Sequence, residues 1–127
     1  MEIGFIEKLK REYTLVPVCP EVLGGLSTPR DPCEICGNCV MTKNGRDCTY
    51  EYQKGAETAL KIALENEVDF CILKSKSPSC GNEYVYDGSF TGTLKPGMGI
   101  TAELLVKSKF IVYNETQISV RFEKEKK

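Results

Sequence analysis

The spacing of apolar residues predicts three helices along the chain. Phe5, Leu9 and Tyr13 recur every four residues among charged neighbours, which is the pattern of an amphipathic helix. Residues 51–66 carry a longer apolar stripe of the same period, and residues 100–107 form a shorter helical segment. The first two segments each present one apolar face that a globular fold would bury.

Three short apolar runs predict buried strands. They cover residues 15–19, 68–73 and 110–113 and are rich in β-branched and aromatic residues, although Pro17 interrupts the first. Residues 84–90 alternate around an Asp-Gly pair, which is a hairpin signal. Because helices and strands alternate, we expect an α/β fold, a small three-layer Rossmann-like domain with a mostly parallel sheet. The first predicted element is a helix, so this sheet lacks the leading strand with which such folds normally start.

Length and composition indicate one domain. The 127 residues are 41% hydrophobic and 28% charged, and we assign residues 1–127 to a single domain with a mobile tail at 119–127. A net charge of -1 argues against binding to a nucleic acid polymer or an anionic membrane, because both need a cationic excess. No apolar run is long enough for a signal peptide or a membrane span, so we expect a cytoplasmic protein.

The chain has seven cysteines and no histidine. Without histidine there is no Ser-His-Asp or Cys-His catalysis and no histidine ligand for zinc. Any metal site must therefore use thiolates, carboxylates or backbone atoms. In a reducing cytosol, clustered cysteines more often bind metal than form disulfides, so the cysteines are the main candidates for chemistry.

Two cysteines are expected at one edge of the sheet, where α/β folds bind ligands. Cys19 ends the first predicted strand, and Cys80 lies in the loop that follows the second. Glu21 and Ser77 stand near them in sequence and add a carboxylate and a hydroxyl. The alternative is that both cysteines are small buried hydrophobic residues. We favour a site because both lie beside glycine-rich loops, whereas Cys71, within an apolar strand, is expected to be a core residue.

A second group of cysteines lies close together after residue 30. Their spacing is C-x2-C-x2-C-x8-C, which suits one tetrahedral zinc or one iron–sulfur cluster. The alternative is that they are surface cysteines in a variable loop. We favour a metal site, with zinc and iron–sulfur both open. The four residues are Cys33, Cys36, Cys39 and Cys48.

Three motifs resemble the family of bacterial and archaeal thiouracil desulfidases. They are residues 17–26 (PVCPEVLGGL) with Thr28-Pro29-Arg30, residues 74–81 (KSKSPSCG), and Tyr86-Asp87-Gly88. The resemblance extends over about residues 5–118, and its first two motifs are the most specific.

The resemblance implies a small α/β domain that holds a [4Fe-4S] cluster by three cysteines. The fourth iron stays open and takes the sulfur of a thiolated uracil without net redox change. By matching position, Cys19 and Cys80 are two of the three ligands. Glu21 is then the acid/base, and Ser77 orients the substrate by hydrogen bonding. The expected partner is a small thiolated pyrimidine.

The sequence departs from the family pattern in two places. The family normally begins with a further strand and a Cys-Leu-Leu-Gly-like turn that supplies the first ligand, and no such segment stands here. The family loop after Thr-Pro-Arg also lacks the second group of cysteines. Alternatives are therefore an inactive, N-terminally truncated homologue, a non-catalytic zinc or iron–sulfur module, or an electron carrier. The sheet edge left unpaired by the absent strand makes a homodimer a further expectation.

Overall fold

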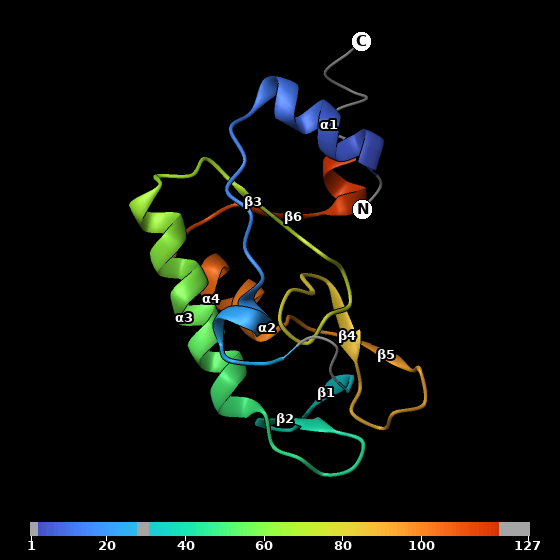
Figure 1. Cartoon of the computed structure of the whole chain (residues 1–127). Coiled ribbons are helices and arrows are strands. Elements are labelled where there is room, and N and C mark those ends of the chain that lie inside the picture. Colours follow the sequence, from blue (N-terminus) through green and yellow to red (C-terminus); the bar gives the residue numbers. More distant parts are fainter. Residues whose placement is uncertain (1–2, 28–30, 120–127) are drawn as a thin grey trace.

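The structure is a computed structural model that describes residues 3–27 and 31–119. It has the α/β architecture that the sequence predicts (Figure 1). The Thr28-Pro29-Arg30 motif and residues 120–127 of the expected tail lie outside the described residues. In chain order the elements are α1 (Ile3–Glu12), α2 (Pro20–Leu23), β1 (Cys33–Cys36), β2 (Cys39–Thr42), α3 (Thr49–Glu65), β3 (Cys71–Leu73), β4 (Tyr84–Tyr86), β5 (Leu94–Pro96), α4 (Ile100–Lys107) and β6 (Val112–Asn114).

The three predicted helices are confirmed as α1, α3 and α4. β3 and β6 form a parallel pair in which Ile72 lies opposite Tyr113, and α4 precedes β6 in the connection between them. The other two pairs are antiparallel hairpins, β1 with β2 and β4 with β5. The hairpin predicted at residues 84–90 forms from its first strand, β4. Its second strand is β5, which lies after residue 90 and so outside the predicted range.

The strand predicted for residues 15–19 is wrong. This segment runs from α1 to α2 as extended chain (Figure 1), and no described strand pairs with it. Its side chains stay in contact with solvent, with exposed fractions of 36% for Leu15 and 40% for both Val16 and Val18. An apolar run becomes a strand only beside a hydrogen-bonding neighbour, and Pro17 removes one of the donors it would need.

Within residues 3–27 and 31–119, the core consists of three clusters of buried residues. The first joins α3, β3 and α4 and includes Ala63 and Leu73. The second lies where the β1–β2 hairpin meets the start of α3, around Val40. The third holds α1 against the helical turn at residues 115–119 through Leu9 and Ile118. Residues of all three clusters line the cavity described below.

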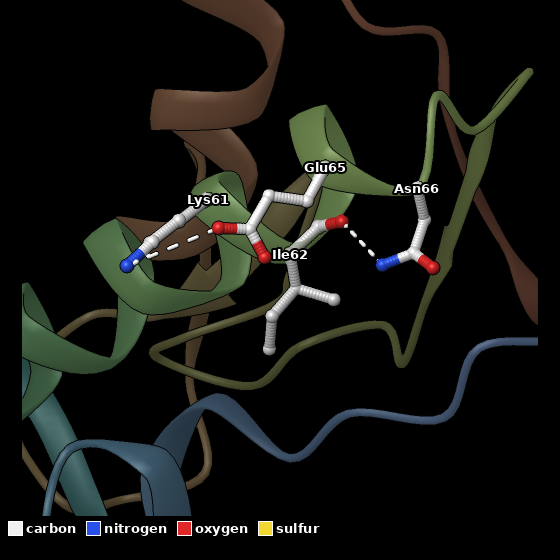
Figure 2. Close-up of polar contacts among 4 residues, drawn as sticks. All are labelled: Lys61, Ile62, Glu65 and Asn66. Atoms are coloured by element: carbon white, nitrogen blue, oxygen red, sulfur yellow. Dashed lines mark hydrogen bonds and ion pairs between the residues drawn. The ribbon is translucent and has the colours of Figure 1, made fainter.

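α3 is the longest helix of the described residues, and local side-chain contacts mark its end (Figure 2). The Asn66 Nδ2 atom donates a hydrogen bond of 2.8 Å to the carbonyl of Ile62. In the last turn, Lys61 Nζ and Glu65 Oε1 lie 3.9 Å apart on exposed side chains. Such a pair contributes only about 0.3–0.5 kcal/mol. Neither α3 nor any other helix in the described ranges is long and apolar enough to cross a membrane.

Candidate functional site

A cavity of about 1830 Å³ lies between the extended segment before α2 and the chain around β3. Ligand pockets commonly measure about 300–1,000 Å³, so this cavity has room for more than one small molecule. Its wall includes all four residues that the sequence places at the expected edge of the sheet, Cys19, Glu21, Ser77 and Cys80.

A hydrogen bond joins the carboxylate and the hydroxyl of this group. The Ser77 Oγ atom donates to Glu21 Oε1 at 3.3 Å. The same Oγ accepts hydrogen bonds from the backbone N–H groups of Ser79, at 3.1 Å, and Cys80, at 3.2 Å. These two donors occupy the lone pairs of the hydroxyl, so its proton is left to point at Glu21.

The Cys80 thiol is buried, with an exposed fraction of 8%. Burial raises the pKa of this thiol to about 11. Within that value, hydrogen bonds with Ser79 and Ser77 lower the pKa of Cys80 and the charges of Glu21 and Cys19 raise it, so both charged groups lie within electrostatic range of its sulfur. Cys19 is exposed at the position before α2. Cys71, expected in the core, is half-buried against the α3–β3–α4 cluster, and burial raises its pKa.

A close backbone contact places α2, and a side-chain hydrogen bond places the loop that follows β3. Pro20 starts α2, and Gly24 at its end lies so close to the carbonyl of Glu51 in α3 that a Cβ would collide with it. In the loop, the buried hydroxyls of Ser79 and Thr101 are hydrogen-bonded at 2.7 Å, which docks the loop on the start of α4. Gly24 therefore serves a contact within the chain, which the sequence did not reveal.

The second group of cysteines is divided between the two faces of the β1–β2 hairpin. Cys36 and Cys39 are opposite each other on one face, across the two-residue turn. Cys33 and Cys48 lie on the other face, in the buried cluster under the hairpin. Burial raises the pKa of the Cys33 thiol to about 11.

This division gives no support to the metal site that the cysteine spacing predicts. Paired residues of a hairpin share a face, and neighbouring residues alternate between faces. Within the part of the chain that the structure describes, no three carboxylate or thiol side chains are grouped so as to hold a metal ion. Zinc or a second cluster at the four cysteines stays a prediction, and the hairpin geometry gives it no support.

Glu34 is a buried residue that the sequence analysis missed. Its exposed fraction is 9%, and its Oε1 atom accepts hydrogen bonds from the backbone of Gly88, at 3.0 Å, and Phe90, at 3.1 Å. The available signal was a carboxylate inside a strand of otherwise apolar residues and cysteines, Cys33-Glu34-Ile35-Cys36. A charge in such a strand is retained only where partners satisfy it.

Comparison with known proteins places these features in one family. Residues 2–117 match the model of the 2-thiouracil desulfurase family. The chain is 40% identical over 124 residues to the uncharacterized protein YbbK of Bacillus subtilis (strain 168), an alignment that covers 90% of this chain and 82% of YbbK. Among solved structures, the [4Fe-4S]-dependent thiouracil desulfidase TudS matches with a TM-score of 0.88 and 39% identity, covering 94% of this chain and 79% of TudS.

Proposed function

The chain belongs to the 2-thiouracil desulfurase family, and we propose that it removes the sulfur of a thiolated uracil-type base with the help of a [4Fe-4S] cluster. The observation that carries the proposal is the convergence of Cys19, Glu21, Ser77 and Cys80 on one cavity. These residues supply soft ligands, an acid/base and a hydrogen-bonding group from two separate elements, α2 and the loop after β3.

The two thiols at the cavity are of the kind that an iron–sulfur cluster takes, but they are two of the three that the resemblance implies, and the described residues include no group of three thiol or carboxylate side chains placed to hold a metal. Thiolates are the usual ligands of such clusters, and the chain has no histidine that could replace them. Cys19 and Cys80 would supply two of the ligands, and the cavity has room for a cluster together with a base. When bound, a cluster with an open iron supplies a soft Lewis acid that takes the sulfur of the thiocarbonyl group.

The reaction is a hydrolytic exchange of sulfur for oxygen. The oxygen of one water molecule forms a bond to the thiocarbonyl carbon, the carbon–sulfur bond breaks, and the sulfur leaves as sulfide. Carbon keeps its oxidation state, so no electron donor is needed. The products are the oxygenated base and one sulfide for each base converted.

Glu21 is the general base in this proposal. Its Oε1 atom accepts the Ser77 hydrogen bond, and a carboxylate placed in this way can take a proton from the attacking water. Ser77 fixes the orientation of the carboxylate, since its own hydroxyl is held by two backbone donors. Both residues line the cavity in which the base would bind.

Replacing Glu21 tests this assignment. In anaerobically reconstituted protein, Glu21→Gln is expected to keep the iron content of the wild type and to lower turnover of 2-thiouracil by about 10²–10⁴-fold. The matched control is Glu57→Gln, a carboxylate on the exposed face of α3, which should leave both quantities unchanged. Wild-type turnover by Glu21→Gln would remove Glu21 from the mechanism.

A further inference from the structure

The turn after β4 is held against β1 by a buried carboxylate. Glu34 Oε1 accepts the N–H groups of both Gly88 and Phe90, and the Cys36 thiol lies 3.5 Å from the Gly88 carbonyl. The approach is close, because a Cβ on Gly88 would come within 2.7 Å of the carbonyl of Ile35. Two backbone donors therefore share one carboxylate oxygen, and this pair of hydrogen bonds fixes the turn against β1.

Phe90 adopts an unusual backbone conformation in this turn. Its φ of +58° is in the left-handed region, which is rare for a bulky residue and strains the backbone. Glu34 holds the N–H of this same residue. Strained residues of this kind persist where the surrounding structure fixes them, and they concentrate at ligand sites.

The strained residue faces the cavity of the proposed active site. Phe90 and Tyr86 both line it, together with Glu21 and Cys80, and both aromatic side chains are half-buried. A partly exposed aromatic ring in a cavity wall offers a flat apolar surface. Planar heteroaromatic bases stack on such rings, because every base has a π-face.

We propose that Phe90, assisted by Tyr86, is the stacking surface for the pyrimidine ring of the substrate, and that Glu34 is the positioning residue that holds Phe90 in place. The inference rests on the proposed function for the identity of the base. It assigns base recognition to the β1–β4 side of the cavity, and the chemistry to α2 and the loop after β3. Stacking binds the ring of substrate and product alike and does not act on the sulfur.

Binding and turnover of the reconstituted protein test this assignment separately. Equilibrium dialysis measures the Kd for uracil, and steady-state assays measure KM and kcat for 2-thiouracil. Phe90→Leu is expected to raise both Kd and KM roughly tenfold, the order expected for the loss of one stacking contact, with kcat little changed. Phe90→Tyr keeps a ring and should restore wild-type values.

Substitutions of Glu34 test its positioning role. Glu34→Ala removes the acceptor of two backbone donors and should raise KM and Kd while kcat stays near the wild-type value. Glu34→Gln keeps an acceptor oxygen and should restore most of the affinity. The matched control is Glu83→Ala, which removes a carboxylate that accepts hydrogen bonds from Asn114 and Gln117 and does not line the cavity.

The outcomes separate this inference from the proposed function. Wild-type KM and Kd in folded Phe90→Leu would overturn the stacking role, even if the protein desulfurates thiouracil. A protein that binds uracil through Phe90 but releases no sulfide would support the stacking role and overturn the proposed function. Loss of affinity in Glu83→Ala equal to that in Glu34→Ala would overturn the positioning role.

Discussion

At the scale of single residues, the site depends on polar contacts between parts of the chain that are far apart in sequence. Glu115, after β6, accepts hydrogen bonds from the backbone N–H and the hydroxyl of Ser75, in the loop after β3. The sequence motifs point to both Glu21 and Ser77 as site residues, and the two side chains are joined by a hydrogen bond. The motifs did not predict Glu34 or Glu115, because nothing near these carboxylates in the sequence indicates a partner about 40–55 residues away.

The Ser75–Glu115 contact should make part of the stability depend on pH. Burial raises the pKa of Glu115, but the hydrogen bonds from Ser75 and from its own backbone, together with the charge of the N-terminus, outweigh this, and the net pKa is below the ordinary 4.5. A carboxylate with a lowered folded-state pKa stabilises the fold above its unfolded-state pKa and loses this contribution as the pH falls through the folded-state value. We therefore expect Glu115→Gln to lower the free energy of unfolding by about 1 kcal/mol at neutral pH.

Urea unfolding of wild type and Glu115→Gln over a series of pH values measures this effect. The difference between the two proteins should shrink as the pH falls below 4.5. Glu83→Gln, which changes a second hydrogen-bonded carboxylate, is the comparison protein at each pH. A Glu115→Gln difference that stays constant into the acid range would show that ionisation of Glu115 does not stabilise the fold.

At the scale of elements, the position of α2 decides where Cys19 and Glu21 lie. Two glycines bring α2 into backbone contact with α3, because a Cβ on Gly24 would collide with the carbonyl of Glu51 and one on Gly55 with that of Pro20. The sequence predicted α3 from its apolar stripe but not α2, which is only four residues long. It also predicted a strand before Cys19, and this strand does not form. Cys19 still reaches the cavity, because it directly precedes α2 and α2 is docked on α3.

Replacing Gly55 tests this docking contact. In an ordinary helix interior, Gly→Ala stabilises by roughly 0.8–1 kcal/mol. Here the added methyl group meets the backbone of α2, so Gly55→Ala is expected to destabilise the protein by about 1–3 kcal/mol. It should also reduce the iron retained after reconstitution, since α2 carries Cys19. Thermal unfolding and metal analysis measure the two effects.

Gln53→Ala is the matched control, because Gln53 is on the exposed face of the same helix. This variant should leave the unfolding temperature and the iron content nearly unchanged. An unfolding temperature that rises in Gly55→Ala would show that α2 does not depend on this close approach.

At the scale of the whole molecule, the two proposed roles, the chemistry and the binding of the base, lie on different sides of one cavity. α2 and the loop after β3 carry the thiols, the carboxylate and the hydroxyl, while the turn after β4 carries the aromatic surface. The sequence predicted the α/β class from the alternation of helices and strands, and it predicted that Cys19, Glu21, Ser77 and Cys80 would share one site from the short motifs that contain them; the four residues line one cavity, and their chemical role stays a proposal. It could not predict the three small sheets that the described residues form, or the split of the second cysteine group, because both follow from which strands pair.

The direct test is the conversion of 2-thiouracil by anaerobically reconstituted protein without any added electron donor. The account predicts that uracil and sulfide appear in equal amounts, turnover after turnover, and that Cys80→Ser, which removes a proposed cluster ligand, loses both iron and activity. Protein that retains its iron and binds the base but forms no uracil, or forms it only with an added electron donor, would contradict the account.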